Sequence, residues 1–412
     1  MKKNIDNLMA QENLDAIWIS GPLRHNPDMV YFTGIHHVNN ADLFKIRDRE
    51  PILYYFVDME REEAEKTGLE SVSYGRKYPL GAYLEDTNGD YTKSVALRLS
   101  DILIELGLEK GRVAILGVLP FNYLFTLVET LKQILPELDW ITELKDTITA
   151  RARMTKDNEE LEKIKHMGNI TVEVVSRVQS YLQSQKVMGE TLVHPDGTPI
   201  QVQDMKRLIN IWLLELGTEN THETIFSIGR DGGIPHNSGN PEDSIPLGVP
   251  IVFDVFPQEA GGGYFYDFTR TWCLDHASAS VETIHNHVLT IHDAIISDLL
   301  VGTPFKAYQE KACQLFSELG YPTIADDAAI QEGYIHSVGH GIGLNIHEKP
   351  FSGSNAAPQD VLIPGVAFTI EPGLYFPSQN MGVRIEDTIY LDHYGKFQIP
   401  AEYPYDLVIP MK

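Results

Sequence analysis

Five residues whose side chains bind divalent cations lie in the C-terminal half of the chain, each beside a glycine, proline or β-rich segment. They are Asp254, Asp267, His340, Glu371 and Glu386. Four carboxylates and one imidazole suit a pair of hard or borderline divalent cations. Without cations, the converging negative charges would repel one another and would be costly to desolvate. A bound metal pair would remove that cost and supply a hydrolytic nucleophile, so these residue types favour hydrolysis.

The two aspartates belong to strand-like runs, PIVFDVFP and GYFYDFTRTW, that flank the segment PQEAGGG. A hairpin centred between Ala260 and Gly261 would place Asp254 directly opposite Asp267. Directly opposed side chains have Cβ atoms about 5 Å apart, which is close enough for one cation to lie between them. The alternatives are a solvent-facing aspartate pair and a bulge at the glycines that changes the register.

The segment HSVGHGIGLNIH contains His336, His340 and His347, interleaved with glycines at 339, 341 and 343. The glycines disfavour a helix and allow tight backbone geometry around a loop or strand that carries histidines. Three histidines in twelve residues favour a site, whereas a single histidine is usually a structural residue. His336 is interpreted as structural or as a contact to the ligands.

The glutamates lie in FTIEPGLYF and GVRIEDTIYL. Glu371 precedes a Pro-Gly pair at a predicted strand end, where a site can open. Strand alternation puts Arg384 and Glu386 on one face. The alternatives are surface charges and, for Glu386, a structural ion pair with Arg384.

The composition is that of an ordinary globular protein: 412 residues, 43% hydrophobic and 22% charged, with a net charge of -25. This acidity argues against a nucleic-acid or anionic-membrane partner, because both need clustered Lys and Arg. Cys273 and Cys313 fit neither a metal motif nor a disulfide framework. The N-terminus has no apolar h-region and no run approaches the ~18 residues of a membrane span, so we expect a cytoplasmic location.

Two regions are predicted from the periodicity. Residues 1–150 alternate strand-like runs (14–20, 51–58 and 112–117) with a helical pattern over 93–111, which is typical of an α/β domain. Thr155 is the predicted N-cap of a helix that opens residues 151–412, and further helices are expected at 204–217, 279–300 and 306–319. With its β-rich segments, the second region is predicted to be one α+β domain.

The segments DFTRTW, HGIGLNIHE, IEPGLYFP and GVRIED together resemble the metallopeptidase family of Xaa-Pro aminopeptidases, prolidases and methionine aminopeptidases, over residues 155–410. The resemblance implies the "pita-bread" fold and a dinuclear centre held by Asp254, Asp267, His340, Glu371 and Glu386. Asp267 and Glu386 would bridge both metals. The two divalent ions would be manganese by family analogy, with cobalt or zinc as alternatives.

The same resemblance assigns His236, in GGIPHNSGN, and His347 to the substrate-facing side, where they bind or protonate the substrate. Glu371 would also accept the proton of the attacking water, and Arg384 matches the arginine beside the bridging glutamate. Residues 15–35 resemble the opening of the N-terminal domain of Xaa-Pro aminopeptidases, prolidases and creatinases. Creatinases do not keep the ligand set, so the resemblance favours the proline-directed branch.

The resemblance therefore implies a pita-bread catalytic domain (151–412) behind a smaller creatinase-like α/β domain (1–150). The expected activity is cleavage before proline, as an Xaa-Pro aminopeptidase or dipeptidase, on proline-containing peptides, by a homodimer or homotetramer. The alternatives are a non-hydrolytic peptide- or protein-binding member of the fold, and a metal-dependent hydrolase of phosphoester-like substrates.

Several features depart from the family pattern. The spacing of 13 between the aspartates is two longer than usual, and residues 183–203 look inserted. Prolidases often place an arginine before the EPG segment to hold a dipeptide carboxylate, and here that loop offers Lys349. Tyr264, Tyr266 and Phe351 are candidates for a proline pocket.

Overall fold

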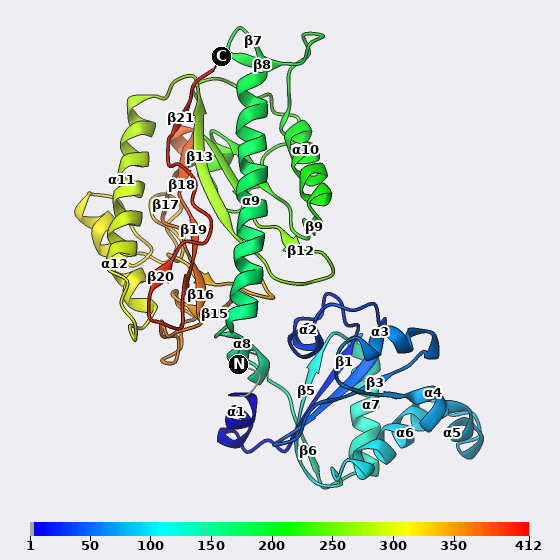
Figure 1. Ribbon diagram of the computed structural model, residues 1–412. Coiled ribbons are helices and arrows are strands. Elements are labelled where there is room, and N and C mark those ends of the chain that lie inside the picture. Colours follow the sequence, from blue (N-terminus) through cyan, green and yellow to red (C-terminus); the bar gives the residue numbers. More distant parts are fainter. Residues whose placement is uncertain (1–3, 144, 412) are drawn as a thin grey trace. The chain divides into compact units, whose positions relative to one another are not determined.

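The computed structural model describes residues 4–143 and 145–411, which form two compact units (Figure 1). One unit comprises Met1–Arg153 together with Gly261–Gly263, and the other comprises Met154–Ala260 with Tyr264–Lys412. No helix among the described residues combines the length and the apolar character that a membrane crossing needs.

The smaller unit is built on a six-stranded mixed sheet in the order β4-β3-β2-β1-β5-β6. Its strands are β1 (Ala16–Gly21), β2 (Ala41–Ile46), β3 (Ile52–Tyr55), β4 (Glu70–Ser73), β5 (Gly111–Gly117) and β6 (Leu138–Ile141). Its helices are α1 (Ile5–Gln11), α2 (Pro27–Thr33), α3 (Arg61–Glu65), α4 (Tyr74–Lys77), α5 (Leu80–Asp86), α6 (Tyr91–Glu105), α7 (Phe121–Ile134) and α8 (Ile148–Arg153). The three predicted strands and the predicted helix over 93–111 are confirmed as β1, β3, β5 and α6.

The larger unit contains four long helices: α9 (Asn158–Ser184), α10 (Val202–Glu215), α11 (Ala279–Ser297) and α12 (Lys306–Glu318). The prediction that Thr155 caps α9 is wrong. Thr155 instead bridges to Val366, so the chain stays extended until Asp157. Asp157 accepts from the backbone N–H of Glu160, whose side chain accepts in return, which forms a capping box.

Two sheets of the larger unit carry the predicted ligands. The first has the order β10-β11-β13-β21 and the second the order β15-β14-β16-β19-β20. The strands are β10 (Ile225–Ile228), β11 (Ile251–Val255), β13 (Phe268–Leu274), β21 (Val408–Ile409), β14 (His340–Gly341), β15 (Glu348–Phe351), β16 (Ala367–Ile370), β19 (Asp387–Leu391) and β20 (Phe397–Gln398). An isolated bridge between Thr269 and Glu386 joins the two sheets.

Short strand pairs complete the larger unit: β9 (Thr218–Glu219) with β12 (Gln258–Glu259), β17 (Gly373–Phe376) with β18 (Met381–Arg384), and β7 (Lys186–Met188) with β8 (Thr191–Val193). The last pair is a hairpin within the segment 183–203 that looked inserted. Because α11 repeats buried apolar residues at helical spacing, it presents one stripe to the core beneath β16, β17 and β18. The stripe is Val281, Ile284, Val288, Ile291 and Ile295.

The predicted register between the two aspartates is wrong by two residues. Asp254 lies opposite Thr269, and Gln258 lies opposite Phe265. The hairpin is therefore centred between Gly261 and Gly262, whose φ angles of 95° and 90° favour glycine. Since strand side chains alternate with a period of two, this shift keeps Asp254 and Asp267 on one face, diagonally placed instead of opposed.

Candidate metal centre

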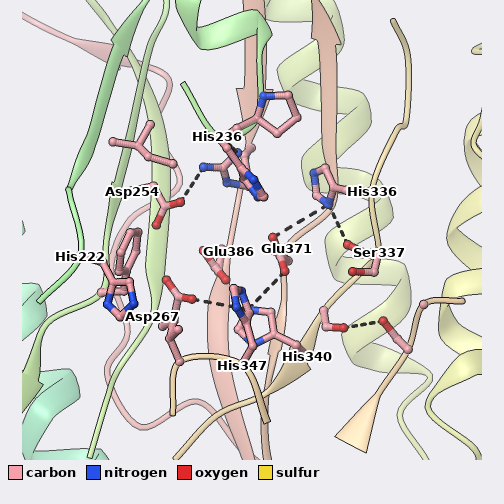
Figure 2. Close-up of a pocket in the computed structure, with 18 of the residues that line it drawn as sticks. His222, His236, Asp254, Asp267, His336, Ser337, His340, His347, Glu371 and Glu386 are labelled. Carbon is pink, nitrogen blue, oxygen red and sulfur yellow. Dashed lines mark hydrogen bonds and ion pairs between the residues drawn. The ribbon is translucent and has the colours of Figure 1, made fainter. Parts of the chain in front are cut away.

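One cavity of about 630 Å³ in the larger unit is lined by the five predicted metal ligands and by the three other residues that the family resemblance assigns to the site (Figure 2). These residues are His236, Asp254, Asp267, His340, His347, Glu371, Arg384 and Glu386. They come from segments that span 150 positions of the chain, so the tertiary fold brings the predicted set together.

Each carboxylate or imidazole of the predicted ligand set lies on or beside a strand of the two sheets. Asp254 belongs to β11 and Asp267 immediately precedes β13, while His340 opens β14. Glu371 follows the last residue of β16, and Glu386 lies between β18 and β19. Short strands and their ends hold the side chains more rigidly than free loops would, which suits a site that must keep its geometry.

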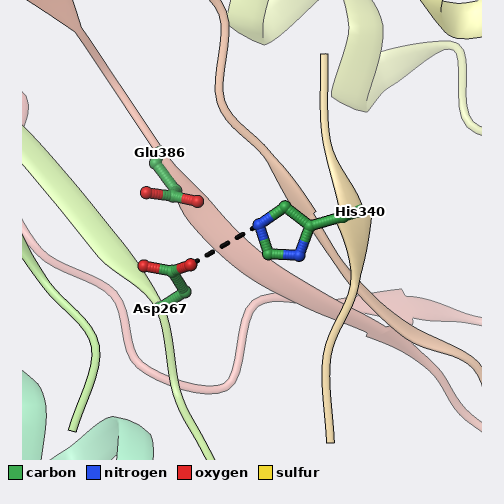
Figure 3. Close-up of side chains that lie close together, drawn as sticks. All are labelled: Asp267, His340 and Glu386. Carbon is green, nitrogen blue, oxygen red and sulfur yellow. Dashed lines mark ion pairs between the residues drawn. The ribbon is translucent and has the colours of Figure 1, made fainter. Parts of the chain in front are cut away.

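Asp267, His340 and Glu386 form the tightest part of the cluster (Figure 3). One ligand atom from each lies within 4.8 Å of the other two. His340 Nε2 is 3.6 Å from an oxygen of Asp267 and 3.5 Å from an oxygen of Glu371. Two ligand atoms that share one cation at bond lengths of about 2.1 Å lie roughly 3–3.4 Å apart, so these spacings suit a cation.

The orientation of the His340 ring leaves the correct nitrogen for a metal. Its Nδ1 lies 3.1 Å from the carbonyl oxygen of Gly341, so Nδ1 carries the proton and donates it. In the neutral imidazole, Nε2 then holds the lone pair and points toward Asp267 and Glu371. A metal-ligating histidine is usually held in this way by a backbone carbonyl.

Three buried carboxylate oxygens in the cluster have no hydrogen-bond partner among the described residues: Oδ1 of Asp254, Oδ1 of Asp267 and Oε1 of Glu386. A buried charged oxygen without a partner costs free energy. All three belong to the predicted ligands and line one cavity. Divalent cations would satisfy them, so the residues present fit a metal centre on the chemistry of their own donor atoms.

Arg384 holds Asp254 in place. Its Nη2 donates to Oδ2 of Asp254 at 2.6 Å, and its Nη1 donates to the hydroxyl of Tyr375 at 2.8 Å. Among the described residues the alternative ion pair with Glu386 does not form: Arg384 pairs with Asp254, and Glu386 accepts a hydrogen bond from the Thr269 hydroxyl at 2.7 Å. Arg384 thus neutralises the carboxylate at one end of the cluster and fixes its orientation.

Burial perturbs the titration of the cluster. It raises the pKa of Asp267 and of Glu386 well above the usual range, and neighbouring carboxylates add to both rises. It raises the pKa of Glu371 to about 8, and it lowers the pKa of His340 to about 3 with a further contribution from His347. Without cations, the protonated forms of these carboxyl groups are therefore stabilised, and a bound cation would displace those protons.

The two histidines predicted to face the substrate border the same cavity. The His347 ring packs edge-on against His340, with centroids 4.3 Å apart, and both His236 and His347 are exposed. They are therefore accessible to a molecule in the cavity, beside the ligand cluster and not within it.

Two suggestions about substrate contacts are not supported by the geometry. Lys349 is buried and pairs with Asp360 at 2.8 Å, so it does not reach the cavity as a carboxylate ligand. Tyr264 donates to Glu160, and Tyr266 is buried in the core, and neither lines the cavity. Phe351 does line it.

His222 lines the cavity, although no sequence motif predicts a role for it. His336, predicted to be structural or to contact the ligands, also lines the cavity. His336 is fixed by two contacts: Nδ1 at 2.7 Å from the carbonyl of Ser337, and Nε2 at 2.8 Å from the Tyr375 hydroxyl. His222 lies in the loop before β10, in a segment without glycines or other histidines. No local signal distinguished it from a surface residue.

Comparison with known proteins finds a family match within the larger unit. The profile described as metallopeptidase family M24 matches residues 162–393. A probable dipeptidase PepE of Mycobacterium tuberculosis is 27% identical over 65% of the chain, and that match spans 63% of the relative's own length. An uncharacterized peptidase of Staphylococcus aureus is 26% identical over 96% of the chain and 97% of its own length.

The fold is shared with solved structures over nearly the full length. The Xaa-Pro dipeptidase from Bacillus anthracis superposes with a TM-score of 0.75 at 21% identity, over 99% of both chains. A likeness at this identity shows the fold, and it confirms the predicted fold class: a smaller N-terminal α/β unit and a C-terminal α+β unit. The predicted family resemblance is confirmed by the matching profile.

Proposed function

The chain belongs to the metallopeptidase family M24, and on that premise we propose that it cleaves the peptide bond preceding proline, as an Xaa-Pro aminopeptidase or Xaa-Pro dipeptidase. The observation that carries the proposal is the set of unpartnered buried oxygens on Asp254, Asp267 and Glu386, which face one cavity with Nε2 of His340. A module that only binds peptides has no need for such costly converging carboxylates.

In this proposal Asp254, Asp267, His340, Glu371 and Glu386 hold two divalent cations. Manganese is proposed by family analogy, with cobalt and zinc as alternatives. Bound there, the cations would lower the pKa of water and polarise the peptide carbonyl.

The chain's own residues have distinct proposed roles around that chemistry. Glu371 accepts the proton of the attacking water and passes it toward the leaving nitrogen. His236 and His347 donate hydrogen bonds to the carbonyl oxygen or to the proline nitrogen, where charge develops. Arg384 positions Asp254 through the 2.6 Å contact and does not touch the substrate.

The test compares the chain with two variants, Asp267→Asn and Glu386→Gln, and with Glu318→Gln as a control at an exposed glutamate outside the cavity. Each protein is dialysed against a chelator, reloaded with manganese and assayed for bound metal and for cleavage. The substrates are an Xaa-Pro dipeptide, a longer Xaa-Pro peptide and an organophosphate ester.

We expect peptide cleavage only by the reloaded parent and the control, with both site variants losing bound metal and activity while keeping their circular dichroism spectra. If only the ester is cleaved, the protein is instead a metal-dependent hydrolase of phosphoester-like substrates. Undiminished peptide turnover by either site variant would overturn the assignment of the ligands.

A further inference from the structure

His222, like His336, is a cavity-lining imidazole that neither the metal cluster nor the proposed mechanism uses. It lies toward the Asp254 end of the site, while His336 and Ser337 lie toward the other end (Figure 2). His222 lines the same cavity as Asp254, His236 and His347, so a molecule that occupies the cavity can contact it.

The ring of His222 is held in place although its residue is exposed. Phe256 and Phe265 pack against it with centroid separations of 6.0 and 5.7 Å and interplanar angles of 64° and 60°. Its Nδ1 lies 3.1 Å from the hydroxyl oxygen of Thr221. A side chain fixed by two rings and a hydrogen bond loses little entropy when it binds a ligand.

The hydrogen bonds of Thr221 define the tautomer of His222. Thr221 donates its hydroxyl hydrogen to Oε1 of Gln258 at 3.3 Å, so its oxygen accepts from Nδ1 of His222. The neutral ring therefore carries its proton on Nδ1 and its lone pair on Nε2. No partner contacts Nε2 in the described part of the chain, so it is available as an acceptor.

The groups around Nε2 complement a basic side chain. Glu223 also lines the cavity, and its carboxylate, though paired with Lys206 at 2.6 Å, keeps an acceptor at this end. Phe256 lines the cavity and offers an apolar surface for an aliphatic stem, and aromatic rings also attract cations. An imidazole acceptor, a carboxylate and an aromatic wall together suit lysine or arginine.

We propose that His222 is a specificity-determining residue that accepts a hydrogen bond from a basic side chain of the substrate, at the residue preceding proline. This inference rests on the proposed function, because it names the peptides that the same cavity prefers. The imidazole does not take part in bond cleavage. It adds binding energy for lysyl and arginyl peptides that a neutral side chain of the same length does not gain.

The experiment uses the metal-loaded full chain and two peptides, lysyl-proline and norleucyl-proline, which differ by one terminal amine. We expect kcat/KM for the lysyl peptide to exceed that for the norleucyl peptide about tenfold, as for a hydrogen bond to a charged group. In His222→Phe the ratio should fall to near one, and in His222→Gln, which retains an acceptor, part of the preference should remain. His276→Phe, at an exposed histidine outside the cavity, should leave the ratio unchanged.

Calorimetric binding of free lysine and free norleucine gives a readout that does not depend on cleavage. Lysine should bind the parent about tenfold more tightly than norleucine, and His222→Phe should remove the difference. If neither peptide is cleaved, the proposed function fails and the calorimetry still decides the role of His222. Equal ratios in the parent and in His222→Phe, by either readout, would overturn the inference alone.

Discussion

The substitution Lys156→Met should destabilise the larger unit strongly. Nζ of Lys156 lies 2.6 Å from an oxygen of Glu348, and the two side chains are only 1% and 2% exposed. Methionine keeps the length of the apolar stem but removes the cation that Glu348 contacts. A buried charge that loses its partner costs about 3–5 kcal/mol, so we expect a loss of that size in the free energy of unfolding.

The double variant Lys156→Met/Glu348→Leu separates charge from packing. Because it removes both charges, it should recover most of the loss and come within about 1 kcal/mol of the parent. The exposed pair of Lys165 and Glu162, at 3.7 Å, is the matched control, and Lys165→Met should change stability far less.

Urea denaturation followed by circular dichroism, at fixed metal concentration, measures these differences. The pair also bears on activity, since Glu348 follows His347 directly in the chain and opens β15. We therefore expect Lys156→Met to lower kcat/KM as well as stability. The reasoning is refuted if Lys156→Met costs less than about 1 kcal/mol, or if the double variant is no more stable than the single one.

Three further predictions concern charge in the larger unit. In chelator, the unfolding free energy should fall as the pH rises from about 6.5 to 8, above the range in which His285 titrates, because folded Glu371 keeps its proton up to a pKa of about 8. Added metal should abolish that slope in denaturation curves. Burial lowers the pKa of His285 from 6.5 to about 4, so the parent at saturating metal, where Glu371 does not titrate, should lose up to about 3 kcal/mol of stability as the pH falls across that range. His285→Gln should lose less unfolding free energy over the same pH range. If the parent and the variant lose stability in parallel, His285 is not the group that titrates. Arg384→Met should weaken metal binding about 10- to 100-fold by calorimetry, since it frees Asp254, and unchanged affinity would exclude this positioning role.

Much of the fold could be predicted from local patterns. Strand-like runs, helical spacing and glycine stops located β1, β5, α6, α10, α11 and α12 within a few residues. These signals lie within one element, so they do not depend on distant contacts. The helix cap at Asp157 was missed because a bridge between Thr155 and Val366, which are far apart in sequence, keeps the chain extended.

The sequence by itself determined the five candidate metal ligands together with His236, His347 and Arg384, because short motifs at strand ends carried both the residue types and their family pattern. Only the tertiary structure decided what each of them touches. Arg384 lies two positions before Glu386 in the chain, yet its guanidinium pairs with Asp254, which is 130 positions away.

Long-range placement likewise buried Lys349 against Asp360 and brought His222 to the wall of the cavity. The physical reason is that ion pairs and cavity walls form between segments distant in sequence. Their partners are set by strand register and sheet packing, and no periodicity within one segment records them.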